Sequence, residues 1–264
     1  PHALTAHSLT TGDSQGFARN KFKSDFTSMK LEPLTQRQQQ QIIENRLGES
    51  AARELRAHIE KLVDSEGNTI CGNPLLLSMV ISIYQAGGAK FPKTRFELYS
   101  SAVDTMLSRL DFKDIAQRRG AESEHVRRLL QALAHNRQHA RDKDITDVEA
   151  SKVIGGDEDL RAAWEYVKEQ VLSGKLPLLG CLESSPVKMR FAHLSLQEFL
   201  CVQHWLTRFS GGQSVAETMP TMQEMLNDGW WLNSLTLACE GHPELSSKLL
   251  GSPPSLKLTG LTGD

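Results

Sequence analysis

Two residues of this chain, Pro74 and His193, stand at the starts of helices, in the segments that carry the best clue to function. His193 ends the alternating segment 190–193 and is followed at once by a strong helix start. Pro74 belongs to the segment Gly72-Asn73-Pro74, which opens an apolar helical stretch. An imidazole at a strand-to-helix junction can reach across a domain boundary, and its N–H group can donate to a phosphate oxygen. The pair therefore indicates nucleotide sensing and not a complete enzyme.

Both residues also have ordinary structural explanations. Pro74 fits the first position of a helix whose N-cap is Asn73. A histidine that ends an edge strand can simply hydrogen-bond a backbone group. Ser195 and Glu198 have the spacing of a capping box, which would account for both of them without a ligand. The residue types alone leave these alternatives open.

The patterns of common catalytic and metal sites are absent from the sequence. It contains no Gly-x-x-x-x-Gly-Lys-Ser/Thr loop to hold phosphates, and no apolar strand ending in paired acids to hold magnesium. His135 and His139 stand one helical turn apart, but two imidazoles without a third ligand make a weak metal site. We expect them on a solvated helix face. We therefore assign no catalytic or metal-binding residue and expect no hydrolysis by this chain alone.

Composition excludes several classes of protein. The 30 Lys and Arg residues nearly balance the 32 Asp and Glu residues, so the net charge of -2 draws the chain neither to nucleic acid nor to anionic membrane. The longest apolar run, residues 74–84, is shorter than the roughly 20 residues that cross a bilayer, and no signal-peptide pattern opens the chain. Four separated cysteines in apolar surroundings predict buried free thiols: Cys71, Cys181, Cys201 and Cys239. These features predict a cytoplasmic protein without membrane contact.

The first half of the chain is predicted to form a compact helical unit. Thr35 with Gln38, and Thr94 with Glu97, have the spacing of capping boxes, and Gly48 ends the first of these helices. Apolar residues at helical spacing predict further helices over residues 51–63 and 75–84. Residues 26–31 alternate weakly and allow one short strand.

The second half combines helices with one hairpin. Helical patterns cover a segment around residues 126–134 and the ranges 146–154, 158–173 and 196–209, and a period of two over 178–183 and 187–191 predicts a hairpin. Three helices, a hairpin and a closing helix are the content of a winged-helix-like domain. Further helices are expected over residues 222–226, 230–239 and 243–250, with Trp230 and Trp231 in packing roles. The predicted fold class is mainly α: a helical domain, a winged-helix-like domain with one β-hairpin, and C-terminal helices.

Two segments resemble signatures of the NACHT family, which belongs to the STAND class of signalling NTPases. They are Gly72-Asn73-Pro74-Leu75-Leu76-Leu77 and residues 191–200, Phe-Ala-His-Leu-Ser-Leu-Gln-Glu-Phe-Leu. Residues 31–35 and the Gln-rich helix after them are similar to the segment that leaves the family's nucleotide-binding domain, and residues 1–4 resemble the segment directly after its Thr-Ser-Arg sensor strand. The resemblance implies four parts, with the Walker A and Walker B segments upstream: 1–31 as the tail of the nucleotide-binding domain, 32–112 as a first helical domain, 120–210 as the winged helix, and 213–264 as the start of a second helical domain and a linker.

The resemblance also implies a function and its site residues. The chain would be the regulatory part of an ATP/ADP-dependent switch, of the kind found in innate-immunity-like signal transduction. The proline matching Pro74 packs beside the adenine, and the histidine matching His193 reaches the terminal phosphate of bound ADP and holds the inactive state. The cofactor would be ADP or ATP, with magnesium supplied through the upstream parts. The partners would be the upstream P-loop domain and, on activation, further copies in a homo-oligomer.

Two other functions remain as alternatives. A nucleotide-independent helical adaptor would use the same folds for protein contacts. A winged-helix nucleic-acid binder would use Arg127, Arg128, Lys188 and Arg190 as its basic contacts. A recognition helix should carry several Lys or Arg residues toward the groove, and the helix over 196–209 carries only Arg208. The sequence therefore argues against nucleic acid as a partner.

Overall fold

The computed structural model describes residues 32–62, 69–86, 91–110, 123–212, 219–242 and 244. Within these ranges the chain is mainly α-helical, with a small three-stranded antiparallel sheet, as predicted. The strand predicted over residues 26–31 lies outside the described residues, and so does the helix predicted over 243–250 apart from residue 244.

The first helical unit contains α1 (Gln36–Leu47), α2 (Glu49–Ile59), the 3-10 turn η1 (Ile70–Gly72), α3 (Pro74–Gln85) and α4 (Arg95–Ser108). The predicted capping box of Thr35 and Gln38 opens α1. Thr94 caps α4, but Glu97 accepts a hydrogen bond from the backbone N–H of Lys93 at 2.6 Å and does not complete the predicted box. The helix boundaries here are therefore set largely by local capping groups.

Helix α3 is apolar around most of its circumference, and its position explains why. It packs on both α1 and α4, and six of its residues are buried: Leu76, Leu77, Met79, Val80, Ile81 and Ile83. At its start the side chain of Asn73 accepts a hydrogen bond from Leu75 N at 2.9 Å, and Pro74 is the first helical residue. The predicted start of α3 is confirmed.

The second unit has the element order of a winged helix. It runs α5 (Ser123–His139), β1 (Asp144–Thr146), α6 (Asp147–Ile154), α7 (Glu158–Leu172), β2 (Leu179–Ser184), β3 (Val187–Phe191) and α8 (Leu194–Ser210). The hairpin of β2 and β3 confirms the predicted one, and the sheet order is β1-β3-β2. Strand β1 was not predicted, because three residues are too few to show an alternating pattern. Its pairing with β3 buries Ile145 opposite Met189.

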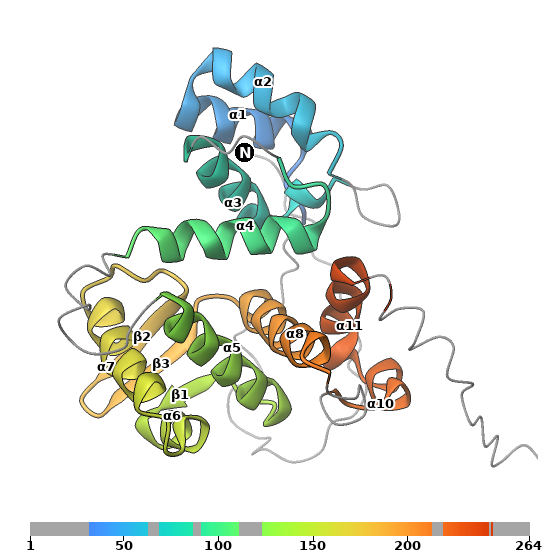
Figure 1. Cartoon of the computed structure of the whole chain (residues 1–264). Helices are drawn as coiled ribbons and strands as arrows, with labels where there is room; N and C mark the ends of the chain where they lie inside the picture. Colours follow the sequence, from blue (N-terminus) through green and yellow to red (C-terminus); the bar gives the residue numbers. More distant parts are fainter. Residues whose placement is uncertain are drawn as a thin grey trace, which may run out of the picture.

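Helix α4 joins the two units. Figure 1 shows it lying across the molecule between α1 to α3 and the winged helix, and it packs on both α8 and α11 (Gly229–Gly241). The short helix α10 (Met222–Asn227) precedes α11 and packs on it. The buried apolar side chains form one continuous cluster through both units, with Phe199 and Trp205 of α8 among the largest that are fully buried.

The two adjacent tryptophans of α11 take part in this packing, as predicted. Trp231 is buried, and its ring centroid lies 5.9 Å from that of Trp205. The indole N–H of Trp230 donates to the backbone oxygen of Gln138 at 2.9 Å. Both rings therefore hold α11 against the winged helix.

Candidate functional site

His193 is the N-cap residue of α8. Its ring Nδ1 accepts a hydrogen bond from the backbone N–H of Ser195 at 3.3 Å and lies 2.7 Å from Ser195 Oγ. The predicted capping box of Ser195 and Glu198 is therefore wrong, because the imidazole itself satisfies the free amide at the helix start. The His193 side chain is exposed.

These contacts determine which ring nitrogen of His193 is available. A nitrogen that accepts from a backbone N–H carries no proton, so a neutral ring held in this way bears its proton on Nε2. Among the residues that the structure describes, none forms a hydrogen bond with this nitrogen. His193 thus presents an exposed N–H donor at the junction of β3 and α8.

The anchor of His193 is connected to the first helical unit. Tyr99 of α4 lies near Ser195, and its ring stacks on Phe199 with the centroids 5.6 Å apart. Burial raises the pKa of Tyr99 above its ordinary value, and the nearby Ser195 hydroxyl acts in the opposite direction. A displacement of α4 relative to α8 would therefore disturb the group that orients His193.

Pro74, the second predicted site residue, lies exposed at the first position of α3. Helix α3 packs on α4, and α4 packs on α8, so α4 lies between the helices that carry Pro74 and His193. Neither residue lines any of the described cavities. The structure of this chain thus gives Pro74 and His193 no common pocket, and their shared nucleotide site stays a prediction.

Glu198 serves a different contact from the predicted one. Its side chain is buried, and Oε2 accepts a hydrogen bond from Asn233 Nδ2 of α11 at 2.5 Å. Burial raises the pKa of this carboxyl group, and the Asn233 hydrogen bond partly offsets that effect. Glu198 therefore joins α8 to α11. The only sign of this contact in the sequence was that Glu198 is a charged residue on a largely apolar helix.

A second polar contact joins α4 to α11. Glu240 Oε1 accepts from Arg95 Nε at 3.1 Å and from Arg95 Nη2 at 2.8 Å, and its other oxygen accepts from the backbone N–H of Phe96 at 3.2 Å. Phe96 also packs on Gly241 so closely that a Cβ atom there would lie 2.6 Å from the ring. Sequence analysis missed this contact because its partners are far apart in the chain.

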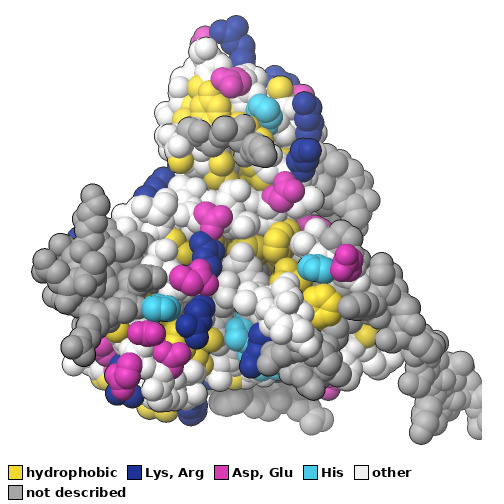
Figure 2. All heavy atoms as spheres, viewed as in Figure 1, with side chains coloured by type: hydrophobic (Ala, Val, Ile, Leu, Met, Phe, Trp, Pro, Cys, Tyr) yellow, Lys and Arg dark blue, Asp and Glu magenta, His cyan; other side chains and the backbone are white. Residues whose placement is uncertain are grey.

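The basic residues considered for nucleic-acid binding are all paired with acids. Lys188 and Arg190 both contact Asp144, at 2.8 Å and 2.6 Å, and hydrogen bonds from these two residues lower the pKa of that carboxyl group. Arg127 contacts Asp104 at 2.6 Å, and Arg128 contacts Asp157 at 3.4 Å. Figure 2 shows that Lys and Arg side chains alternate with Asp and Glu over the middle of the face drawn there.

The helix that would enter a DNA groove is α7 and not α8. Helices α6 and α7 are joined by a short turn, and in a helix-turn-helix arrangement the second helix is the recognition helix. The expectation that residues 196–209 would form the recognition helix is therefore wrong. Helix α7 carries more acids than bases: Glu158, Asp159, Glu165 and Glu169 against Arg161 and Lys168.

The cysteine prediction is confirmed in part. All four thiols are free, and Cys71 and Cys201 are buried, but Cys239 is only half-buried and Cys181 of β2 is exposed. The prediction that Cys181 is buried was wrong because the sequence does not show which face of the hairpin is covered by other elements.

Metal clusters and membrane-spanning helices were both sought among the described residues, and neither was found. It contains no group of three His, Cys, Asp or Glu residues arranged to hold a metal ion. No helix among the described residues is both long and apolar enough to span a bilayer.

His135 does not lie on a fully solvated face, because it is half-buried and its ring stacks on that of His204 with the centroids 4.5 Å apart.

A scan against protein-family models finds no match to this chain, and a search of the curated proteins finds none either. The resemblance to the NACHT family therefore rests on short sequence motifs and on the order of the elements around them.

Proposed function

We propose that this chain is the regulatory part of a NACHT-type ATP/ADP-dependent signalling switch, acting with a P-loop domain of the same polypeptide. The observation that carries the proposal is the exposed Nε2–H donor of His193 at the start of α8. A phosphate oxygen is a charged acceptor, and hydrogen bonds to charged acceptors are stronger than those between neutral groups. In this proposal Pro74 packs beside the adenine, and magnesium is held through the P-loop domain.

The proposed switch depends on contacts that exist in only one domain arrangement. A ligand biases a conformational equilibrium only by its differential affinity for the two states. ADP bound by the P-loop domain, with its terminal phosphate on His193, would favour the closed and inactive arrangement. Because Tyr99 of α4 stacks on Phe199 of α8, the state of this site is coupled to α4. Exchange of ADP for ATP would release the winged helix and permit homo-oligomer formation in the cytoplasm.

The test compares variants of the polypeptide that carries both the P-loop domain and this chain. We expect His193→Ala to retain less ADP after purification and to shift toward larger assemblies. His125→Ala, another histidine of the winged helix, should leave both properties unchanged. Nucleotide content is measured by chromatography of the released nucleotide, and size by light scattering. Unchanged ADP content and size in His193→Ala would remove the proposed role of His193.

A nucleotide-independent adaptor is the second candidate, because α10 and α11 expose apolar side chains. Leu226 is 61% exposed and Leu232 is 56% exposed, which suits a protein contact. In this case partner binding and stability would not respond to ADP, so the same experiment separates the two candidates. We do not propose nucleic acid as a partner, because α7 is acidic and the basic residues considered for it are paired with carboxylates.

A further inference from the structure

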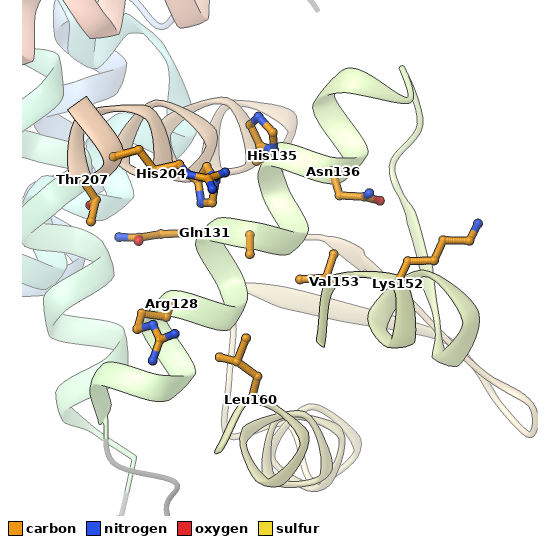
Figure 3. Close-up of a pocket in the computed structure, with 11 residues that line it drawn as sticks. Arg128, Gln131, His135, Asn136, Lys152, Val153, Leu160, His204 and Thr207 are labelled. Atoms are coloured by element: carbon orange, nitrogen blue, oxygen red, sulfur yellow. The ribbon is translucent and has the colours of Figure 1, made fainter. Parts of the chain in front are cut away.

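The winged helix contains a cavity of about 500 Å³ in which every charged lining residue is basic. Helices α5, α6, α7 and α8 form its walls, and Figure 3 shows Arg128 and Leu160 toward one end and His135 and His204 toward the other. This volume is typical of a small-molecule site, for which pockets run from roughly 300 to 1,000 Å³. Neither His193 nor Pro74 lines the cavity, so it is separate from the proposed switch site.

Arg208 is the cation best placed to meet a ligand in this cavity. Its Nη1 lies 3.4 Å from His204 Nε2, and no carboxylate of the described residues lies within ion-pair distance of it. Arg128 contacts Asp157 at 3.4 Å, and the two side chains are 48% and 35% exposed. Solvent therefore screens this ion pair, and it is weak. Lys152 also lines the cavity, but Figure 3 shows its side chain extending away from the other labelled groups. Arg208 and Arg128 are therefore the cations available to an anion.

His204 lies beside Arg208 and is neutral. Guanidinium groups only donate, so His204 Nε2 accepts from Arg208 and a neutral ring carries its proton on Nδ1. Burial and then the charge of Arg208 lower the pKa of His204 to about 4, which keeps the ring neutral at physiological pH. The ring is also held in place by stacking on His135. Arg208 therefore stands beside a neutral imidazole that is fixed in place.

The remaining lining residues suit the body of an organic molecule. Ala132, Val153 and Leu160 contribute apolar surface, and Gln131 and Asn136 contribute amide groups. Apolar walls with a few placed polar groups are the usual composition of a small-molecule site. The cavity therefore offers an anion-binding end and an apolar wall.

We propose that this cavity binds a small organic phosphate, with the phosphate group on Arg208 beside His204 and the organic body along Val153 and Leu160 toward Arg128. This site is additional to the nucleotide contact of His193 and does not depend on it.

The first test is calorimetric titration of the 264-residue chain at constant ionic strength. The probes are phenyl phosphate, inorganic phosphate and phenol, which separate the contribution of the phosphate from that of the apolar ring. We expect saturable binding of phenyl phosphate that is tighter than binding of inorganic phosphate or of phenol. Absence of saturable phenyl phosphate binding would overturn the proposal.

The second test uses matched variants. Removing one charge-assisted contact in Arg208→Gln should weaken phenyl phosphate binding by about tenfold or more. Arg161→Gln removes an arginine of α7 that pairs with Glu158 outside the cavity, and should leave binding unchanged. Thr207→Glu adds a negative charge at an exposed position of the cavity wall and should also weaken binding. If Arg208→Gln and Thr207→Glu, confirmed as folded by circular dichroism, bind as tightly as the unmodified chain, the site assignment is wrong.

Discussion

The contact of Glu240 with Arg95 and Phe96 yields the most closely defined prediction. In Glu240→Gln the side chain keeps its length but loses its charge and one acceptor oxygen. The single remaining oxygen can still accept from Arg95, while the new amide NH₂ group would face the backbone N–H of Phe96. The variant therefore replaces an ion pair by hydrogen bonds from the Arg95 guanidinium to a neutral oxygen, and leaves one backbone donor without its acceptor.

The expected cost is the sum of these two changes. Loss of the carboxylate charge amounts to about 1 kcal/mol, and an unsatisfied backbone N–H to about 1 kcal/mol more. Because the Arg95 and Glu240 side chains are 26% and 25% exposed, solvent replaces part of both contributions. We predict that Glu240→Gln lowers the free energy of unfolding by about 1 to 2 kcal/mol.

The assay is urea unfolding followed by tryptophan fluorescence, together with hydrogen exchange of the Phe96 amide. Glu60→Gln is the matched control, because Glu60 pairs with Arg56 at 2.9 Å on the surface with side chains 59% and 56% exposed. Such a pair contributes only about 0.3 to 0.5 kcal/mol. The Phe96 amide should exchange about tenfold faster in Glu240→Gln only. Equal unfolding free energies for the two variants would refute the argument that this contact ties α4 to α11.

Three further predictions concern the core and the titrating groups. The pKa of His204 is lowered to about 4 from an ordinary value of 6.5, so the unfolded chain binds more protons than the folded chain between these pH values. The free energy of unfolding should therefore fall as the pH drops through this range, by at most about 1.4 kcal/mol per pH unit. Urea unfolding at pH 7 and pH 5 should show a smaller fall in His204→Asn. Phe199→Ala should lower the unfolding free energy by about 3 to 5 kcal/mol, because the ring is fully buried, and a loss below about 1 kcal/mol would contradict the packing described. A thiol reagent should label Cys181 in the folded chain. It should label Cys71 and Cys201 only on unfolding, because both are buried and burial raises the pKa of Cys71 to about 12. Fast labelling of either buried thiol would contradict this assignment.

Local signals predicted the helices well because the groups that start them lie close in the sequence. The Thr35 box opens α1 and the Asn73 cap with Pro74 opens α3, as the spacing indicated. Strand β1 was missed because its existence depends on pairing with β3, which lies far along the chain. The sequence therefore indicated the mainly helical fold and the hairpin but not the third strand of the winged helix.

The candidate sites show the same division between local and distant information. The position of His193 at a strand-to-helix junction followed from local pattern, but its role as the N-cap of α8 did not, since Ser and Glu at capping-box spacing were the stronger signal. Glu198 contacts Asn233 because of tertiary packing, which the spacing does not encode. The basic cavity brings Arg128 of α5 together with Arg208 of α8, and no sequence pattern relates these helices.

The most direct test of the proposed switch is the affinity of the P-loop-containing polypeptide for ADP and for AMP, with and without His193→Ala. Because AMP lacks the terminal phosphate that His193 is proposed to contact, the substitution should weaken ADP binding by about tenfold and leave AMP binding unchanged. Equal ADP affinity in the two proteins, or an equal loss for ADP and AMP, would contradict the proposed contact.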